Sequence, residues 1–325
     1  MDWSKAAELI RNSTKILIVT HVSPDGDAIG SLLGLGIALK EMGKTVTMAV
    51  DGGVPLALRF LPGAGEILAS VKPGLQVDLF IAVDCGDAER TGKVGAQGFA
   101  FNVPTINLDH HRTNTNFADA NLVDENTVAA AEGVLDLLDR LGVAPSAAVA
   151  ECLLCGVVTD TLCFRTSNVT SATLGKAQRL MAAGADLSGI VQRTVSHLST
   201  AALKLWKQVM PTVCLEDHVV WATITLAMRQ DSGYIDGADG GLVSLLIQAD
   251  EAYVSCVLRE KEDNTVELSI RAVPGFDVSD YSLSLGGGGH TLAAGATVKG
   301  SLAEVEALVI PTLKAIAKAG KPLYS

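Results

Sequence analysis

The sequence feature that most constrains the fold is a series of short apolar runs, each followed by an aspartate or a histidine. In the first half of the chain they alternate with helical patterns, as in a parallel sheet flanked by helices. We expect strands at Ile16–Thr20, Val46–Val50, Leu79–Val83 and Thr105–Leu108, and helices at Ala28–Met42, Val128–Leu141, Ala147–Val158 and Ser171–Ala183. Open α/β sheets bind ligands outside the carboxyl ends of their strands, so the residues after these runs are candidate site residues.

The second half of the chain is richer in strand patterns. We expect strands at Val219–Leu226, Ala252–Leu258 and Thr265–Ala272, then a glycine run and a last helix at Ala303–Ala317. A chain of 325 residues exceeds the size of most single cores, so two domains are expected. We predict an α/β fold with an N-terminal parallel-sheet domain (1–186), a helical linker (187–210) and a smaller C-terminal α+β domain (211–325).

Charge and hydropathy exclude some classes of protein. A net charge of −11 disfavours binding of long duplex nucleic acid, which needs a basic surface, but a small anionic substrate can be held through bound cations. No apolar run reaches the length of a membrane span, and Met1–Arg11 lacks the basic start of a signal peptide. We expect a cytoplasmic protein without membrane contact, and the apolar composition is compatible with a homodimer.

The six cysteines do not form a disulfide-scaffold pattern. Cys152 and Cys155 make a CxxC within an apolar run, with no second pair nearby. We interpret both as small buried hydrophobic residues of a core helix. A redox or zinc-thiolate protein would require more thiolates at fixed spacing, and thiol titration would test that alternative.

The first candidate cluster follows the strand at Ile16–Thr20. His21 is followed by Asp25-Gly-Asp27, where proline and glycine force a tight loop before the next helix. This loop lets one imidazole and two carboxylates converge. The alternative is that one aspartate only caps the helix.

Further candidates lie at other ends of the apolar runs. Asp84 follows Leu79–Val83, Asp109-His110-His111 ends the next run, and Asp160 ends a later one. Oxygen and imidazole ligands without thiolates suit Mn²⁺ or Mg²⁺ better than a thiolate zinc site. The number of carboxylates suggests two ions about 3.5–4 Å apart, the arrangement used for in-line attack on phosphorus.

These residues together resemble a known family. His21-x-x-Pro-Asp25-Gly-Asp27, Val83-Asp84, Asp109-His110-His111 and Thr159-Asp160-Thr161 are similar to the motifs of the DHH phosphoesterases, and the segment Gly286–Gly295 resembles the glycine-rich signature of their DHH-associated domain. The whole pattern is most similar to the nanoRNase branch of the family, whose members are bifunctional oligoribonucleases and pAp phosphatases.

The resemblance implies a role for each candidate. His21, Asp25 and Asp84 would hold one Mn²⁺, and a second would be held by Asp27, Asp84, His110 and Asp160, with Asp84 as the bridge. His111 would face the substrate phosphate, and Asp109 would orient the histidines, a common role for carboxylates beside ligating imidazoles. His111, Asp84 and Asp109 would form the catalytic set.

The C-terminal candidates would bind substrate. The glycine run, including Gly287, Gly288 and Gly289, allows close backbone approach to a ligand, and His290 follows it. Arg271 lies on the polar face of its predicted strand and suits bidentate phosphate recognition. Ala272 stands where the family commonly has serine.

Several substrates fit this chemistry. The resemblance implies short oligoribonucleotides or 3′-phosphoadenosine 5′-phosphate, with linear or cyclic dinucleotides (pApA, cyclic di-AMP) as the alternative. An inorganic pyrophosphatase or exopolyphosphatase is less favoured, because pyrophosphate has no nucleoside for the glycine loop. A non-catalytic nucleotide-binding protein is a further alternative, but none of the expected ligands is missing.

Overall fold

The computed structural model describes residues 1–72, 74–234 and 239–323 and divides into two compact units, Met1–His197 and Leu198–Ser325. The division falls between α7 (Leu187–Arg193), which packs on the N-terminal unit, and α8 (Thr200–Val209), which packs on the C-terminal unit. It lies within the segment that the sequence suggests as a helical linker.

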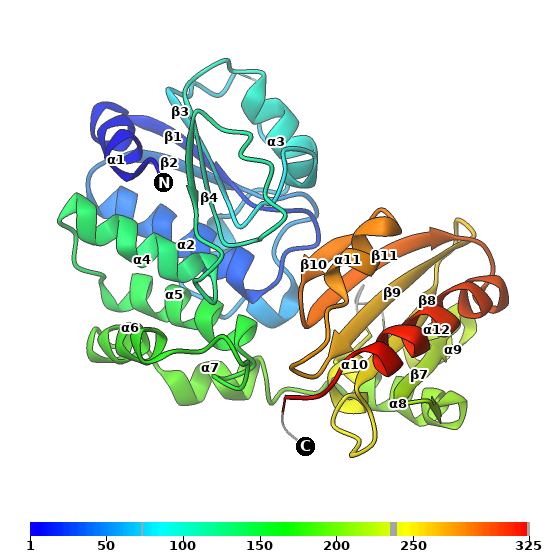
Figure 1. Ribbon diagram of the computed structural model, residues 1–325. Coiled ribbons are helices and arrows are strands. Elements are labelled where there is room, and N and C mark those ends of the chain that lie inside the picture. Colours follow the sequence, from blue (N-terminus) through cyan, green and yellow to red (C-terminus); the bar gives the residue numbers. More distant parts are fainter. Residues whose placement is uncertain (73, 235–238, 324–325) are drawn as a thin grey trace. The chain divides into compact units, whose positions relative to one another are not determined.

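The N-terminal unit is built on a five-stranded, all-parallel sheet of order β2-β1-β3-β4-β5 (Figure 1). The strands are β1 (Lys15–Val19), β2 (Thr45–Ala49), β3 (Leu79–Val83), β4 (Thr105–Asp109) and β5 (Ala120–Val123). The order reverses between β1 and β3. At such a switch point the loops after neighbouring strands diverge and leave a crevice for ligands.

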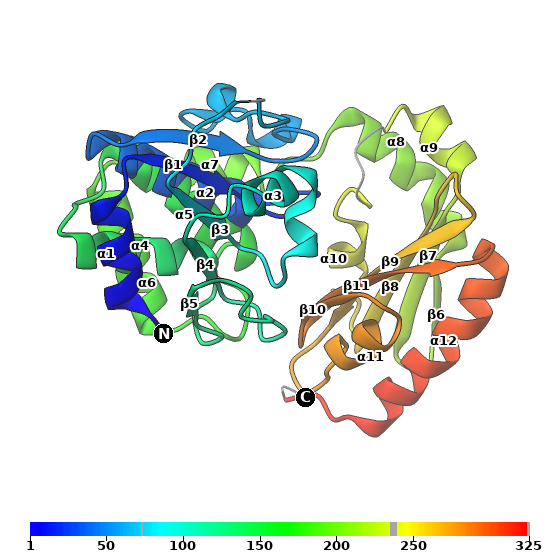
Figure 2. The same cartoon turned by 90° about the horizontal axis from the view of Figure 1, so that it is seen from above.

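Helices cover both faces of this sheet (Figures 1 and 2). The larger core joins one face to α1 (Trp3–Asn12), α2 (Gly26–Glu41), α4 (Ala130–Leu141), α5 (Ala147–Asp160), α6 (Ser171–Ala182) and α7. A smaller core joins the other face to α3 (Gly92–Phe99). Short 3-10 helices lie at Leu56–Leu58, Ala64–Glu66 and Glu89–Thr91. Burial on both faces explains why β3 is a continuous apolar run.

Glycines let α2 and α5 approach closely. A Cβ on Gly30 of α2 would lie 2.4 Å from the carbonyl oxygen of Cys152 in α5, and one on Gly34 would lie 2.4 Å from Leu153 Cδ2. Both distances are shorter than van der Waals contact. The glycines therefore set the separation of two helices that each carry candidate site residues.

A short left-handed segment follows α5. Leu162, Cys163 and Phe164 have φ angles of 48°, 62° and 61°. The Thr161 hydroxyl supports this turn, because it donates to the carbonyl of Val157 (2.6 Å) and accepts from the amide of Phe164 (2.9 Å). The segment thus ends the helix abruptly.

Replacement of Leu162 by glycine should stabilise the protein by roughly 0.5–1 kcal/mol. Its Cβ is strained at positive φ, and glycine adopts this conformation without that strain. The side chains of Cys163 and Phe164 pack against the larger core, whereas Leu162 is not among the packed residues. Urea unfolding would measure the change. Phe164→Gly is the matched control and should be destabilising, so a stabilised Phe164→Gly or a destabilised Leu162→Gly would contradict the argument.

The C-terminal unit contains a six-stranded mixed sheet of order β10-β11-β9-β8-β7-β6, in which only the β7–β8 pair is parallel. The strands are β6 (Cys214–Glu216), β7 (Val219–Ile224), β8 (Val254–Glu260), β9 (Thr265–Ala272), β10 (Gly288–His290) and β11 (Ala293–Lys299). This confirms the predicted fold class of a parallel-sheet domain followed by an α+β domain.

Two apolar clusters sandwich the second sheet. One involves α11 (Ser279–Ser284) and α12 (Leu302–Ala319), and the other involves α8, α9 (Leu226–Ser232) and α10 (Leu242–Leu246), with a 3-10 helix at Met210–Thr212. Residues of β9 alternate between buried and half-buried positions. The half-buried set, which includes Glu267, Ser269 and Arg271, therefore shares one face of the strand.

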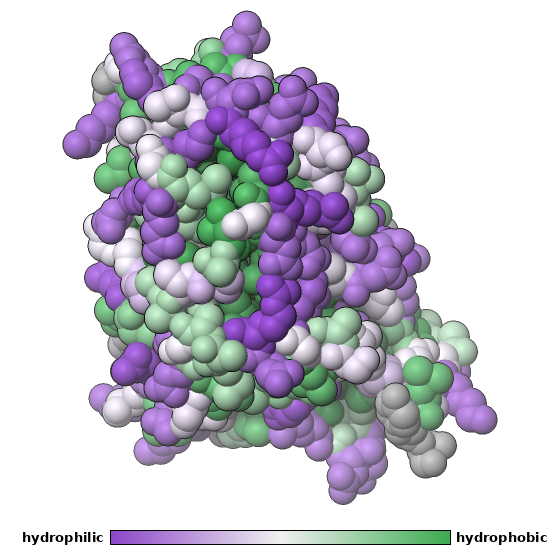
Figure 3. All heavy atoms as spheres, turned by 90° about the vertical axis from the view of Figure 1, so that its left-hand side faces the viewer, coloured by the Kyte–Doolittle hydropathy of each residue, from purple (hydrophilic) through white to green (hydrophobic). Residues whose placement is uncertain are grey.

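The surface seen in Figure 3 intersperses hydrophilic and hydrophobic residues, with a row of strongly hydrophilic residues running across it. Exposed large apolar side chains include Leu174 and Met181, both on α6. Within the described ranges, no helix combines the length and apolar character needed to cross a membrane.

The thiols should differ widely in reactivity. Cys152, Cys155, Cys256 and Cys85 are buried, whereas Cys214 is exposed. Burial raises the pKa of the Cys155 thiol to about 12, so little of the reactive thiolate forms near neutral pH. We expect Ellman's reagent to modify Cys214 rapidly and the buried thiols only after unfolding. Rapid modification of Cys152 and Cys155 that a chelator accelerates would instead support the zinc-thiolate alternative.

Candidate metal centre

The loop after β1 places His21 and Asp25 near the switch point of the sheet. Nδ1 of His21 lies 2.8 Å from the carbonyl oxygen of Val22, so Nε2 is the ring nitrogen that faces the carboxylates. Nε2 lies 3.4 Å from Asp84 Oδ2 and 3.9 Å from Asp25 Oδ1. Asp25 does cap α2, because its Oδ1 accepts from the amides of Asp27 and Ala28. Capping uses one oxygen, so it does not exclude a ligand role for the other.

Asp84 is the first residue after β3 and has φ of 54°, a conformation that aspartate tolerates better than most residues. It is 2% exposed. Its Oδ1 is buried without a hydrogen-bond partner among the residues that the structure describes. An orphaned buried carboxylate oxygen is costly unless a cation occupies the position beside it.

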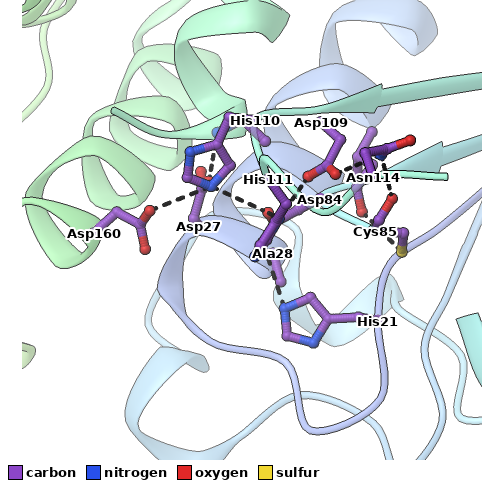
Figure 4. Close-up of polar contacts among 12 residues, drawn as sticks. His21, Asp27, Ala28, Asp84, Cys85, Asp109, His110, His111, Asn114 and Asp160 are labelled. Atoms are coloured by element: carbon purple, nitrogen blue, oxygen red, sulfur yellow. Dashed lines mark hydrogen bonds and ion pairs between the residues drawn. The ribbon is translucent and has the colours of Figure 1, made fainter. Parts of the chain in front are cut away.

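His110 follows β4 and faces three carboxylates from different elements (Figure 4). Its Nε2 lies 3.4 Å from Asp160 Oδ2, 3.5 Å from Asp84 Oδ1 and 3.6 Å from Asp27 Oδ2. These separations exceed normal hydrogen bonds and leave room for a cation among the four groups.

Asp160 is the last residue of α5. An aspartate at the end of an apolar run is often the N-cap of a following helix, but Asp160 is not, because α5 ends with it and Thr170 caps the next helix. The left-handed turn at Leu162–Phe164 stops α5, so the carboxylate lies at its carboxyl end.

Asp109 and His111 form a hydrogen-bonded pair beside the cluster. Nδ1 of His111 lies 2.7 Å from Asp109 Oδ1, and the other oxygen of Asp109 accepts from the side-chain amide of Asn114 at 2.6 Å. His111 Nδ1 also lies 3.6 Å from Asp84 Oδ1. Since both oxygens of Asp109 are engaged, this carboxylate can orient His111 but is poorly placed to bind an ion.

The buried groups perturb one another strongly. Burial would lower the pKa of His21, but the carboxylates of Asp84 and Asp25 raise it to about 9. Burial, together with the charge of Asp84, raises the pKa of Asp27 to about 7. Burial also raises the pKa of Asp160 well above its usual range. The cluster thus retains protons that a divalent cation would displace on binding.

Two groups of possible ligands match the two predicted ions, and a third group, Asp84, Asp109 and His111, contains the hydrogen-bonded pair described above. His21, Asp25 and Asp84 offer ligand atoms within 4.8 Å of one another, and so do Asp27, His110 and Asp160. Asp84 links the sets, since its two oxygens face His21 and His110 respectively. The donor set and the orphaned oxygen fit a pair of divalent cations.

Comparison with known proteins agrees with this geometry. Residues 15–157 match the model of the "DHH family, N-terminal domain", and residues 219–319 match that of the "DHHA1 domain". The chain is 38% identical to a bifunctional oligoribonuclease and PAP phosphatase NrnA of Thermus thermophilus, over 88% of this chain and 84% of that protein. The chain belongs to the DHH family. It is a hydrolase that acts on phosphoester bonds.

Two other proteins are similar to nearly the whole length of this chain. A crystal structure of an exopolyphosphatase-related protein from Bacteroides fragilis superposes with a TM-score of 0.88 at 26% identity, and covers 98% of this chain and 97% of that one. The cyclic-di-AMP phosphodiesterase GdpP of Geobacillus thermodenitrificans is 26% identical over 97% of this chain, which spans 50% of that protein.

The DHHA1 region contains the predicted substrate residues. Nη1 of Arg271 on β9 donates to the carbonyl of Ile270 at 2.9 Å, and Ala272, on the opposite face of the strand, is 8% exposed and belongs to an apolar cluster. A serine at position 272 would therefore not share the face of Arg271. His290 ends the edge strand β10 and is half-buried.

Backbone geometry explains most of the glycines in the run. Gly286 has φ of 78°, and a Cβ on Gly287 or Gly289 would lie 2.0 Å or 2.4 Å from carbonyl oxygens of β11. A Cβ on Gly288 would meet no atom within 4 Å. Close pairing with β11 thus accounts for two of the three glycines predicted to bind substrate, and Gly288 is the one left for another role.

Two residues near the DHH-domain cluster were not among the sequence-based candidates. Nη2 of Arg90 lies 3.5 Å from His21 Nδ1, and the hydroxyl of Ser31 donates to Asp27 Oδ1 at 3.1 Å. Ser31 lies one helical turn after Asp27, so helical spacing is the signal that could have identified it. Arg90 has no comparable signal, because its position depends on how the loop after β3 folds.

Proposed function

We propose that this DHH-family hydrolase is a manganese-dependent phosphoesterase of short oligoribonucleotides and 3′-phosphoadenosine 5′-phosphate. The observation that carries the metal dependence is Asp84, a buried carboxylate with an orphaned oxygen between two sets of ligands. The similarity to the oligoribonuclease and PAP phosphatase of Thermus thermophilus over most of both chains supports this substrate class.

The hydrogen bonds of each carboxylate suggest how the ions are shared. Asp27 accepts three hydrogen bonds, so it has room to bind one ion. Within the described residues, no backbone amide donates to Asp84, so both of its oxygens can bind cations. We assign His21, Asp25 and Asp84 to one Mn²⁺, and Asp27, Asp84, His110 and Asp160 to the other.

Two bound cations would supply Lewis acidity and an activated water for in-line attack on phosphorus. The DHH-domain residues would orient the phosphate and transfer the proton. His111 is held by Asp109 through Nδ1, so Nε2 is the nitrogen that can exchange a proton with a phosphoryl oxygen. Burial raises the pKa of Asp109, but the hydrogen bond from His111 outweighs burial and lowers this pKa below its usual value. Asp109 therefore stays ionised, and its negative charge would stabilise the positive charge that His111 gains when it accepts a proton.

The DHHA1 residues are proposed to bind the rest of the substrate. Arg271 offers a planar guanidinium for a phosphate, His290 ends the glycine-rich strand, and Gly288 leaves backbone accessible to a ligand. Gly287 and Gly289 contribute by keeping β10 flat against β11.

A second candidate function is hydrolysis of linear or cyclic dinucleotides such as pApA and cyclic di-AMP. The similarity of nearly the whole chain to GdpP favours it. Both substrate classes carry phosphoesters between nucleosides and fit the same metal chemistry.

Purified protein with Mn²⁺ should be assayed against a dinucleotide-to-pentanucleotide RNA series, pAp, pApA, cyclic di-AMP and pyrophosphate. The proposal expects the highest kcat/KM for short RNA and pAp, and loss of activity with EDTA that Mn²⁺ restores. Preference for cyclic di-AMP would support the second candidate, and preference for pyrophosphate or no turnover would contradict both.

A further inference from the structure

The carboxylate of Asp27 is enclosed by protein groups on three sides. Its Oδ1 accepts from the Ser31 hydroxyl (3.1 Å) and from the amide of Ala131 (3.0 Å), and its Oδ2 accepts from the amide of Ala130 (2.5 Å). Ala130 and Ala131 begin α4, so Asp27 of α2 caps a helix about a hundred residues later in the sequence. The residue at the local N-cap position, Ala129, has no side chain that could do this.

Gly156 of α5 packs against the Oδ1 side of the same carboxylate. A Cβ at this position would lie 2.6 Å from Asp27 Oδ1, 2.8 Å from Ala131 Cβ and 3.3 Å from Asp27 Cα. The first two distances are shorter than real Cβ atoms adopt, and Ala131 Cβ and Asp27 Cα are fixed to the backbones of α4 and α2, so they cannot turn aside as the end of a long side chain can. Residue 156 must therefore be glycine for Asp27 to keep its position.

This enclosure restricts which lone pair of Asp27 a metal can reach. A carboxylate has about four lone-pair sites. Two donors occupy Oδ1 and one occupies Oδ2, which leaves one site, on the oxygen that lies 3.6 Å from His110 Nε2. Asp27 is 1% exposed, so no water competes for the occupied sites from outside.

We propose that Ser31, Gly156 and the first amides of α4 form a socket that fixes Asp27 as a one-oxygen ligand of the ion held with His110 and Asp160. Ser31 and Gly156 are then positioning residues for one of the two metal sites. The inference rests on the two-ion site of the proposed function. It adds that Ser31 and Gly156, which are not ligands, determine the Mn²⁺ affinity of one site and not of the other.

Direct Mn²⁺ titration by calorimetry, on full-length protein stripped with EDTA, tests the socket. Wild type should bind two ions. Ser31→Ala should weaken one site by about tenfold and leave the other unchanged, because loss of a partner of a ligating carboxylate typically weakens metal binding by 10–100-fold. Gly156→Ala should weaken the same site at least as much. In both variants, activity relative to wild type should be low at limiting Mn²⁺ and closer to wild type at saturating Mn²⁺.

Gly34→Ala is the matched control. It adds a methyl group to the same α2–α5 packing about two helical turns from Asp27, where it meets Leu153 Cδ2 (2.4 Å) and Cγ (2.8 Å) and not the carboxylate, so the cost of overpacking should appear in stability while both ions bind as in wild type. Circular dichroism melting would report folding separately, and if Gly156→Ala does not fold, Ser31→Ala alone decides the question.

The outcomes separate the two proposals. A wild type that binds fewer than two ions would contradict the proposed metal centre. A wild type with two ions and a folded Ser31→Ala variant of unchanged affinity would overturn the socket and leave the metal centre standing. The socket would also be overturned if Gly34→Ala weakened one site as much as Gly156→Ala does.

Discussion

Asp84→Asn should lower kcat by roughly a thousandfold or more, because the change removes the carboxylate that links the two sets of proposed metal ligands. Loss of one preorganised electrostatic contact costs about 10²–10³ in rate, and in the proposed site both ions share the Asp84 side chain. Asparagine tolerates the positive φ of this position as aspartate does, so the backbone should be retained. Steady-state assays with short RNA at saturating Mn²⁺ would measure the effect.

Thermal melting distinguishes loss of metal from loss of fold in this variant. Ions at about 100 times their dissociation constant stabilise a folded protein by about 2.7 kcal/mol. For a unit of this size that corresponds to roughly 5–10 °C. We expect Mn²⁺ to raise the melting temperature of wild type but not of Asp84→Asn. Asp139→Asn, which removes only an exposed pair with Arg179, should behave as wild type. Full activity of Asp84→Asn would exclude Asp84 as the shared ligand.

The fold could be predicted where periodicity was strong. Runs such as Leu79–Val83 and amphipathic stretches such as Ala130–Leu141 contain the information for their own structure, since burial of their apolar faces determines both conformation and position. The helix at Trp3–Asn12 and the strands Ala120–Val123 and Ala293–Lys299 were not predicted. The two strands lack a long apolar run and depend on pairing with a neighbour, which is a tertiary effect.

The candidate site could be predicted from where each apolar run ends. A parallel sheet brings the carboxyl ends of its strands to one edge, so His21, Asp84 and His110 were expected to lie close together, and the structure places them so. Their roles as ligands stay a prediction. The hydrogen bonds of the carboxylates could not be predicted, because the amides that hold Asp27 belong to a helix whose position depends on the packing of α2, α4 and α5.

His111→Ala should lower kcat by about 10²–10³ and leave two ions bound. Proton transfer by a positioned side chain contributes typically 10²–10⁴-fold. His111 lies beside Asp84, and its Nδ1 is already engaged by Asp109, so we do not count this histidine among the proposed ligands of either ion. The loss should therefore appear in kcat at saturating Mn²⁺, whereas the Mn²⁺ concentration for half-maximal activity should stay near that of wild type.

Two further variants make the His111 result specific. His197→Ala removes an exposed histidine of the same unit and should retain wild-type kinetics. Asp109→Asn should lower kcat less than His111→Ala, because the imidazole remains and loses only its charged partner. If His111→Ala instead lost one ion, His111 would act as a ligand, and proton transfer would have to be assigned to another group. If Asp109→Asn lowered kcat as much as His111→Ala, the imidazole would be inactive without its orientation by Asp109, and the two residues would act as a single unit.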